Sequence, residues 1–266
     1  MNVPRESLEQ RIREGLARKP LLLMAHAVVG YPSLEANRRM LESMEAAGVD
    51  LVELQLPFSE PIADGPSFVK ANQEAISKGV RWDAYFDLLR WASRTCSFPR
   101  LFMGYYNSAF RMGEEEFCDR LAEAGASGFI IADLPPEEGR GLKALARKRG
   151  LDPILIMTPA TSPERLAEIG AQASGFIYCV ARKGVTGRRT DLSAEVEGFL
   201  ARARKATPLP LGLGFGLKSP ADVRRTRGIA DIAIVGTACL EAWERDGPDG
   251  YEKFLKALVA ETRPES

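Results

Sequence analysis

Short apolar runs alternate with longer stretches of helical periodicity along the whole chain, and this alternation constrains the fold more than any other feature. Each apolar run has the length of a strand, and the stretches between them carry apolar residues at helical spacing. The eight runs are Leu21–Val29, Val49–Gln55, Leu101–Tyr105, Gly128–Ala132, Ile154–Met157, Phe176–Val180, Pro210–Leu213 and Ile232–Val235. Continuous apolar strands joined by helices indicate parallel strands that are buried on both faces.

The stretches between the runs predict the helices that would cover such strands. A leading helix is expected around Ser7 to Lys19, and Tyr251–Glu261 closes the chain. The remaining stretches are Leu34–Ala47, Ser67–Lys78, Trp82–Thr95, Glu115–Ala124, Glu137–Arg149, Pro163–Ile169, Ala194–Ala206 and Pro220–Thr226. Eight strand-and-helix units in 266 residues match the size of a closed parallel barrel. We therefore predict an α/β chain in which residues 1–266 form one (β/α)8 barrel domain, a TIM barrel, with an extra N-terminal helix.

An open, doubly wound sheet is the alternative to the barrel. Such a sheet usually has fewer strands, and one that binds a dinucleotide carries a Gly-x-Gly-x-x-Gly turn after its first strand. Here the first run ends in Val29-Gly30-Tyr31-Pro32, which does not fit that turn. No Pro-rich or Ser-rich linker divides the chain. The sequence therefore favours the closed barrel.

The charge balance argues against two classes of partner. Lys and Arg total 36 and Asp and Glu total 36, so the formal net charge is zero and offers no general attraction to nucleic acid or to an anionic membrane. The first residues, Met1 to Ser7, lack the apolar stretch of a signal peptide, and the longest apolar runs are too short to span a membrane. We expect a cytoplasmic chain with a small-molecule substrate.

Cysteine and histidine usage limits the possible chemistry. The four cysteines, Cys96, Cys118, Cys179 and Cys239, lie far apart without a Cys-x-x-Cys pair, so the sequence supports neither a zinc cluster nor a dithiol redox motif. His26 is the single histidine, which excludes mechanisms and metal sites that need two imidazoles. We therefore expect no metal, and we expect carboxylates, Tyr or Lys to carry any proton transfer.

One acidic residue lies inside an expected strand. Period-two alternation places Glu53 on the same strand face as Leu51 and Gln55, and both faces of a barrel strand are packed. Burial of an ionised carboxylate costs on the order of several kcal/mol unless the group is paired or protonated. Glu53 is therefore a candidate catalytic acid that keeps its proton near neutral pH. The alternative is a structural glutamate bonded to a neighbouring polar group of the barrel.

Two aspartates follow expected strands, where a barrel places its active site. Asp64 lies on the loop from Pro57 to Pro66, which can bring it over the barrel mouth. Its alternative role is to cap the following helix ahead of Gly65, because aspartate accepts hydrogen bonds from the free amides of a first helical turn. Asp133 ends the fourth strand, and helix capping is at least as reasonable for it as chemistry.

Glycine-rich turns after the seventh and eighth strands predict a phosphate site. They are Gly212–Ser219 and Gly236-Thr237, and their loops are neighbours in a closed barrel. Backbone amides of such turns, together with a helix N-terminus, can surround a phosphate group. The alternative is that these are tight turns alone. After the sixth strand, the charged and glycine-containing segment from Ala181 to Asp191 is typical either of a lid over an anionic ligand or of a solvated loop.

Several of these segments together resemble the tryptophan synthase alpha subunit family. The order and spacing match over nearly the whole chain, and the Pro-Phe-Ser-x-Pro-x-Ala-Asp-Gly-Pro loop is a specific signature. The matching segments are Glu53-Leu54 with Leu56-Pro57-Phe58-Ser59-Glu60-Pro61-Ile62-Ala63-Asp64-Gly65-Pro66, Gly104-Tyr105-Tyr106-Asn107, Ala132-Asp133-Leu134-Pro135, Arg182-Lys183-Gly184-Val185-Thr186-Gly187 and Gly214-Phe215-Gly216-Leu217.

The resemblance implies a barrel that cleaves indole-3-glycerol phosphate to indole and glyceraldehyde 3-phosphate by a retro-aldol step. It implies no cofactor and no metal in this chain, and a pyridoxal-phosphate beta subunit as partner in an alpha-beta-beta-alpha complex. By resemblance, Glu53 is the acid that protonates indole C3 and then takes a proton from the glycerol hydroxyl, Asp64 accepts the indole N–H, and Tyr178 lies beside them. The family's substrate positions fall on Met103, Ala132, Thr186 and Phe215, and its phosphate positions on Gly187, Gly216, Gly236 and Thr237.

Several residues depart from the family pattern. Gln55 stands where Gly is usual, Glu60 where Asp is usual, and His26 where an aromatic pocket residue, commonly Phe, is expected. Thr237 stands where Ser is common, and Val28-Val29-Gly30 replaces the usual Thr-Ala-Gly. Glu60 lies toward the beta partner, Gln55 lies two residues beyond Glu53 on the same strand face, and His26 could add a proton donor near the substrate. The alternatives are therefore a stand-alone indole-3-glycerol-phosphate lyase, a relative acting on another phosphorylated substrate, or a subunit retained chiefly to regulate a beta partner.

Overall fold

Eight parallel strands form a closed barrel in chain order, and each strand is hydrogen-bonded to the next, with β8 returning to β1. The computed structural model describes residues 7–180, 194–214 and 216–264. The strands are β1 (Leu22–Val28), β2 (Leu51–Gln55), β3 (Arg100–Gly104), β4 (Gly128–Ile131), β5 (Asp152–Met157), β6 (Ile177–Val180), β7 (Leu211–Gly214) and β8 (Ile232–Val235). The prediction of a closed barrel is confirmed, and the alternative prediction of an open sheet is wrong.

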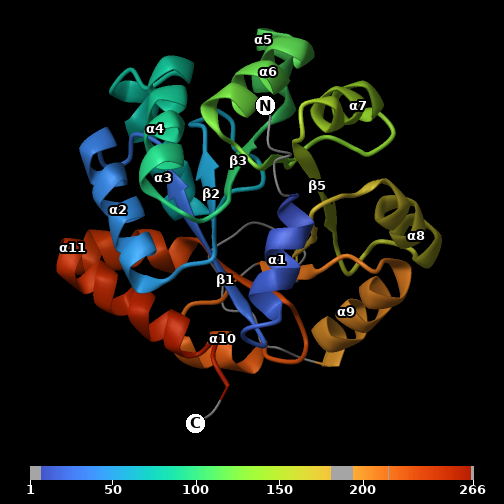
Figure 1. Cartoon of the computed structure of the whole chain (residues 1–266). Coiled ribbons are helices and arrows are strands. Elements are labelled where there is room, and N and C mark those ends of the chain that lie inside the picture. The colour runs from blue at the N-terminus through green and yellow to red at the C-terminus, as the bar shows by residue number, and fades with distance from the viewer. Residues whose placement is uncertain (1–6, 181–193, 215, 265–266) are drawn as a thin grey trace, which may run out of the picture.

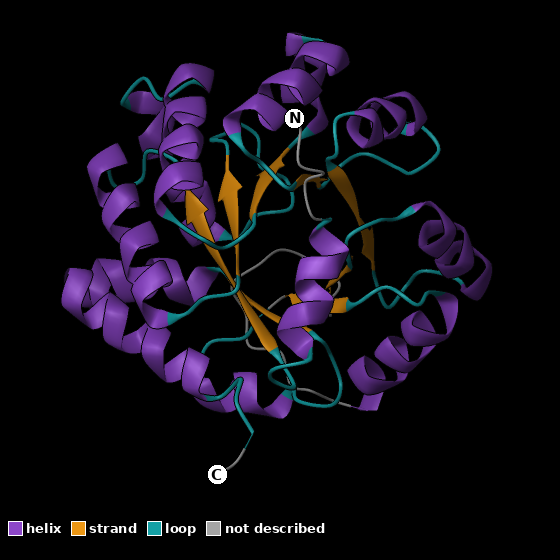
Figure 2. Cartoon of the chain, viewed as in Figure 1, coloured by secondary structure: helices purple, strands orange, loops and turns teal. Residues whose placement is uncertain are grey.

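The helices surround the strand ring, as Figure 2 shows. Their bounds are α1 (Leu8–Leu16), α2 (Leu34–Ala47), α3 (Pro66–Ser77), α4 (Trp82–Thr95), α5 (Tyr106–Met112), α6 (Glu114–Ala124), α7 (Arg140–Lys148), α8 (Pro163–Gln172), α9 (Ala194–Ala206), α10 (Pro220–Arg225) and α11 (Thr237–Ala260). No helix in the described ranges is long and apolar enough to cross a membrane.

Several helices differ from the sequence expectation. Helix α1 ends at Leu16 rather than near Lys19, and α8 continues to Gln172 rather than ending at Ile169. The short α5 was not expected, because its seven residues are too few to establish a helical period. Helix α7 begins at Arg140 rather than Glu137. Helix α11 begins at Thr237, directly after β8, and continues past a kink at Gly247 where φ is 64°. The early start of α11 matters most, because it brings a helix N-terminus to the carboxyl end of β8.

Helix α1 closes the amino end of the barrel. In Figure 1 it lies across the strand ring, and its Leu8 and Ile12 belong to the same buried cluster as the interior side chains Leu22, Leu51 and Ile154 near the strand starts. These interior side chains fill the barrel as a packed core rather than a channel. An open site must therefore lie at the opposite, carboxyl end.

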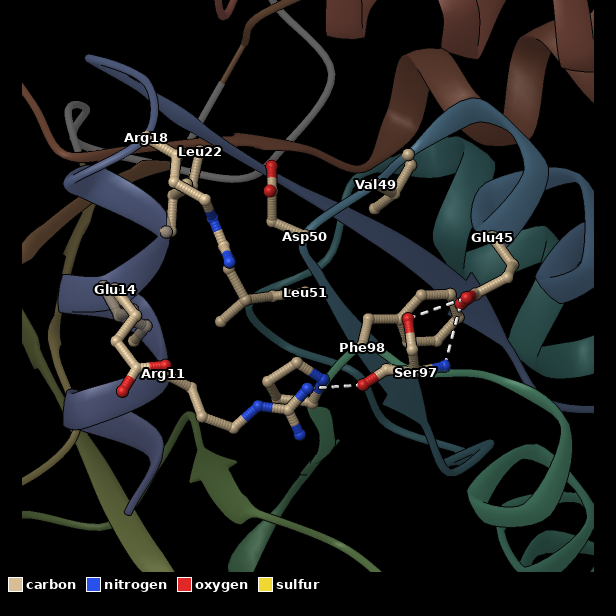
Figure 3. A pocket seen from close by; sticks show the side chains of 14 residues that line it. Arg11, Glu14, Arg18, Leu22, Glu45, Val49, Asp50, Leu51, Ser97 and Phe98 are labelled. Carbon is tan, nitrogen blue, oxygen red and sulfur yellow. Dashed lines mark hydrogen bonds between the residues drawn. The ribbon is translucent and has the colours of Figure 1, made fainter. Parts of the chain in front are cut away.

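Polar contacts hold α1 in this position. Figure 3 shows the cavity between α1, the end of α2 and the start of β2, where Arg11 and Glu45 both bind Ser97. Arg11 donates to the backbone oxygen of Ser97, at 2.5 Å. Glu45 accepts from the amide of Ser97 at 2.9 Å and from its hydroxyl at 2.7 Å. Arg13 also donates to the backbone oxygen of Pro208 ahead of β7, at 2.8 Å.

Close approach of β4 and β5 leads to a stability prediction. Gly128 pairs with Asp152, and a Cβ at position 128 would lie 2.2 Å from the backbone oxygen of Asp152. We expect Gly128→Ala to lower the free energy of unfolding by about 2 kcal/mol or more, because a backbone atom cannot move aside as a side chain can. Urea unfolding followed by circular dichroism measures the change.

Gly198 in α9 provides the matched control. A Cβ there would meet only the end of the Arg202 side chain, at 3.9 Å. Gly198→Ala should therefore raise the free energy of unfolding by roughly 0.5–1 kcal/mol, as expected for alanine in a helix interior. Equal stability of the two alanine variants would show that the contact between β4 and β5 does not require glycine.

Candidate active site

A cavity at the carboxyl end of the barrel collects most of the site residues predicted from sequence. Its lining includes seven of them: Glu53, Asp64, Met103, Tyr178, Gly216, Gly236 and Thr237. The parallel register explains part of this grouping, since β1 and β2 pair His26 with Glu53 and Val28 with Gln55. Side chains that lie far apart in the chain therefore meet at one barrel mouth.

Glu53 is buried and only half satisfied. The residue is 1% exposed, and its side-chain oxygen Oε1 lies 2.7 Å from Nδ1 of His26. Oε2 is buried without a hydrogen-bond partner in the described part of the chain. The structural alternative for this glutamate thus accounts for one oxygen only. A second, unpaired oxygen at a cavity wall suits a group that exchanges a proton with a bound molecule.

His26 connects Glu53 to a second polar residue. Its Nε2 lies 2.9 Å from Oε1 of Gln55, and its ring packs against Phe68 with centroids 4.5 Å apart. Burial alone lowers the pKa of His26, but the charges and hydrogen bonds of its neighbours outweigh burial and raise the pKa above its ordinary value. Glu53 contributes most to that increase, followed by the charge of Asp64. The site therefore favours a protonated imidazole.

Asp64 is also buried, at 8% exposure. Its Oδ2 accepts from Nε2 of Gln55 at 2.7 Å and from Nδ2 of Asn72 at 3.4 Å. Burial raises the pKa of Asp64 above its ordinary value, although these hydrogen bonds and the nearby His26 act in the opposite direction. Among the described residues the side chain of Asp64 binds Gln55 and Asn72 and does not occupy the N-cap position of α3, which is Gly65, so the structure does not support the capping alternative.

Asn72 and Tyr105 hold the loop that carries Asp64. Asn72, in α3, is fully buried; its Oδ1 accepts from the amide of Phe58 at 2.9 Å. The hydroxyl of Tyr105 accepts from the amide of Ala63 at 3.1 Å, and its ring stacks on Phe58 with centroids 4.9 Å apart. Both ends of the loop are therefore fixed to neighbouring elements, which positions Asp64 over the cavity.

Tyr178 on β6 contributes a neutral phenol to the cavity. Burial raises its pKa well above the ordinary value, and the charges of Glu53 and Asp64 raise it further. Its ring lies against the backbone of β7, since a Cβ at Gly214 would be 2.5 Å from ring atom Cε1. Glycine at position 214 therefore leaves the space that the tyrosine ring fills.

Three of the predicted phosphate residues, Gly216, Gly236 and Thr237, line the cavity beside one helix N-terminus. Gly236 is the N-cap of α11 and Thr237 its first residue, and no side chain caps this helix. Gly216 has φ of 85°, a backbone conformation that suits glycine. Lys218 also lines the cavity and adds a cation that sequence reasoning did not select. Its place in the same glycine-rich turn was the signal that could have identified it.

Other predicted residues lie elsewhere. Ala132 lines a neighbouring cavity beside β5 with Asp133 and Thr158, rather than the cavity that contains Glu53. Asp133 accepts from the amide of Tyr106, the first residue of the preceding helix α5, at 2.7 Å, and it is not the N-cap of α7, which follows β4. Three predicted site residues lie outside the described residues: Thr186, Gly187 and Phe215. The predicted lid also lies outside them.

The sequence did not predict which residues form hydrogen bonds with the two carboxyl groups. In the structure these partners are His26, Gln55 and Asn72. Their positions depend on strand register and loop course, which residue patterns do not reveal. No group of three or more His, Cys, Asp or Glu side chains is arranged to hold a metal ion in the ranges that the structure describes.

Comparison with known proteins gives one consistent result. Residues 14–264 match the family model "Tryptophan synthase alpha chain". The tryptophan synthase alpha chain of Desulforapulum autotrophicum is 46% identical over 95% of this chain and 100% of that protein, and the one of Syntrophotalea carbinolica is 46% identical over 94% and 99%.

Solved structures agree with this result. A chain of Mycobacterium tuberculosis tryptophan synthase superposes with a TM-score of 0.92 at 29% identity, covering 98% of this chain and 100% of that one. The tryptophan synthase alpha subunit of Legionella pneumophila superposes with a TM-score of 0.86 at 29% identity, covering 97% and 98%.

The raised pKa of His26 predicts how stability depends on pH. A group whose pKa is raised by folding stabilises the folded state fully below its unfolded value of about 6.5, and the stabilisation is lost as the pH rises through the folded value. We expect the free energy of unfolding of the wild type, minus that of His26→Phe, to decrease as the pH rises above about 6.5. Urea titrations of both proteins measure this difference, and an increase with pH would contradict the assignment.

Proposed function

Because the chain belongs to the tryptophan synthase alpha chain family, we propose that Glu53 and Asp64 perform the reaction of that family in this cavity. The chain is a carbon–carbon lyase of tryptophan biosynthesis, and its reaction is the cleavage of indole-3-glycerol phosphate to indole and glyceraldehyde 3-phosphate. The observation that carries the residue assignment is the buried, unpaired Oε2 of Glu53 in the same cavity as Asp64.

Protonation of the indole ring is the first step. Glu53, as a carboxylic acid, donates its Oε2 proton to C3 of the indole, which leaves a positive charge shared with the ring nitrogen. Asp64, as a carboxylate, accepts the indole N–H and stabilises this charge. The two carboxyls need different protonation states, and their different hydrogen-bond partners supply different environments.

Cleavage of the carbon–carbon bond is the second step. The Glu53 carboxylate takes the proton of the glycerol hydroxyl adjacent to the ring, and the oxygen forms an aldehyde. The bond between that carbon and C3 breaks, and its electron pair returns to the ring to give indole. Glu53 thereby regains the proton that it donated, so the step balances without an oxidant or reductant.

The phosphate group of the substrate fits the turns at the end of β7 and β8. The free amides at the start of α11, at Gly236 and Thr237, and the turn at Gly216 support this placement. Gly187 would complete the phosphate site. The remaining proposed substrate contacts are Met103, Ala132, Tyr178, Thr186 and Phe215.

A partner and a location follow from the same family. We propose that the beta subunit binds where Ile62 and Phe110 are exposed, at 74% and 64%, beside the exposed Glu60. The assembly would be alpha-beta-beta-alpha, with pyridoxal phosphate in the beta subunit and no cofactor in this chain. A biosynthetic role supports a cytoplasmic location, and we propose that residues 1–266 act as one barrel domain.

Loss of either carboxyl group should abolish indole release. We expect Glu53→Gln and Asp64→Asn each to lower the rate by about a thousandfold, because each removes a charge or proton that the reaction needs. Indole release from indole-3-glycerol phosphate by purified protein, alone and with a beta subunit, is the measurement. Glu123→Gln, an exposed carboxyl group on α6, is the control.

The outcomes of this assay separate the candidate functions. Release that depends on both carboxyls and increases with the beta subunit supports the proposed role in the synthase. Strong release without a partner favours a stand-alone lyase. No release from folded protein under either condition rejects the lyase assignment and favours a changed substrate or a regulatory subunit.

Asp64→Asn should also raise the stability of the fold near neutral pH. Folding raises the pKa of this carboxyl, so its ionised form destabilises the folded state above that pKa. A higher urea midpoint for Asp64→Asn at pH 7 than for the wild type is the expected result. A lower midpoint would show that the carboxylate is a net stabilising group.

The proposed partner surface predicts a separate effect. Phe110→Ser should weaken the affinity for the beta subunit about tenfold or more, since exposed aromatic residues commonly dominate an interface, while indole release by the free chain stays unchanged. Titration of the beta subunit against the rate gives the affinity. Unaltered affinity would place the partner on another face.

A further inference from the structure

Four buried side chains form one continuous hydrogen-bonded chain at the barrel mouth. Glu53 Oε1 lies 2.7 Å from His26 Nδ1, His26 Nε2 lies 2.9 Å from Gln55 Oε1, and Gln55 Nε2 lies 2.7 Å from Asp64 Oδ2. All four residues are at most 8% exposed. Two of them, His26 and Gln55, stand where the family commonly has Phe and Gly, so apolar or absent side chains there would leave the two carboxyls unconnected.

The chemistry of the end groups fixes the direction of each bond. Ionised Asp64 only accepts, so Gln55 presents its amide nitrogen to Asp64 and its oxygen to His26. Asn72 Oδ1, at 3.5 Å, is a second acceptor for the same nitrogen. The Gln55 oxygen then requires a proton on His26 Nε2. The proton in the bond between Nδ1 and Glu53 is the one that remains exchangeable.

We propose that His26 and Gln55 are positioning residues that join the two catalytic carboxyls into one buried relay. His26 holds Oε1 of Glu53, which leaves Oε2 directed to the substrate, and Gln55 transmits the charge of Asp64 to the imidazole. This inference rests on the proposed function, because it concerns the same two carboxyls. In this relay the protonated ring of His26 donates to Glu53 Oε1 and to the amide oxygen of Gln55, and it stabilises the anion that Glu53 becomes after it protonates indole.

The groups around His26 agree with this role. Glu53 from β2 and Asp64 from the following loop are the acidic groups that face it. Tyr178 from β6 and Cys239 from α11 face the same centre with raised pKa values, so neither competes as an anion. Phe68 covers the ring from α3, and Lys218 lines the same cavity from the turn after β7.

Substrate binding should act on this relay. An indole N–H that donates to Asp64 competes with the amide of Gln55 for the same carboxylate. Partial neutralisation of Asp64 then weakens its attraction for the protonated ring of His26. Binding of indole thereby changes the electrostatic environment of His26, which holds the proton donor Glu53.

Nitrogen NMR of the full chain with labelled histidine tests the relay directly. His26 is the single histidine, so one pair of ring nitrogen signals reports its tautomer and titration. In the wild type we expect Nε2 to remain protonated at every pH, while Nδ1 alone titrates. Gln55→Met removes the acceptor and should transfer the proton of the neutral ring to Nδ1, beside Glu53. Gln55→Glu keeps an acceptor and should retain the proton on Nε2.

Two further arms test the connection to Asp64. Asp64→Asn should move the His26 titration midpoint to lower pH, and Glu123→Gln should leave it unchanged. Indole-3-propanol phosphate, which has the indole and phosphate but no reacting hydroxyl, should also lower the midpoint. Retention of the Nε2 proton in Gln55→Met, or no response to Asp64→Asn, overturns the relay.

Kinetics provide the functional readout. His26→Phe and Gln55→Met should each lower kcat about tenfold to a hundredfold and change KM less than threefold, since positioning acts on the reacting state. The double variant should be no slower than the slower single variant, because both changes break one relay. Additive losses, or an unchanged pH profile of kcat/KM, contradict the inference.

The NMR result also distinguishes this inference from the proposed function. Wild-type signals that match the relay, in protein that releases no indole, would reject the lyase assignment and leave the relay in place. Indole release with signals that do not respond to Gln55→Met would retain the lyase and reject the relay. Thermal unfolding of each variant identifies any that fail to fold, and Gln55→Glu provides a second, conservative variant.

Discussion

Burial of two carboxyl groups in one barrel mouth is the constraint on which the rest of the site depends. An isolated buried carboxylate is unfavourable by on the order of several kcal/mol, and two close together repel each other. His26 pairs with Glu53, while Gln55 and Asn72 donate to Asp64. These contacts keep both acids in place and give them unlike surroundings, which is what a reaction with one acid and one carboxylate requires.

Sequence patterns predicted the barrel because each buried strand is a continuous apolar run, and they identified Glu53 because it interrupts such a run. They could not decide between capping and catalysis for Asp64, since the answer depends on where Gln55 and Asn72 lie. Helix α5 was missed because it is too short for a periodic signal. The contact between His26 and Glu53 depends on the register of β1 against β2, and a one-residue shift would remove it.

The two ends of the barrel have separate tasks. At the amino end, Leu8 and Ile12 join the interior core, and Arg11 and Arg13 bind backbone oxygens of neighbouring loops. At the carboxyl end, polar groups replace apolar ones, and a buried oxygen of Glu53 has no hydrogen-bond partner among the residues that the structure describes. The amino end therefore contributes apolar packing and contacts to backbone oxygens, whereas the carboxyl end holds the buried carboxyl groups.

Closure of the amino end by α1 also determines where a ligand can enter and leave the barrel. In the part of the chain that the structure describes, the interior near the strand starts is packed and the cavity that Glu53 lines lies at the carboxyl end. A substrate and its products would enter and leave through that end. The exposed Ile62 and Phe110 follow β2 and β3 and so belong to that same end. A subunit bound there would receive the departing indole directly, before it mixes with the surrounding water.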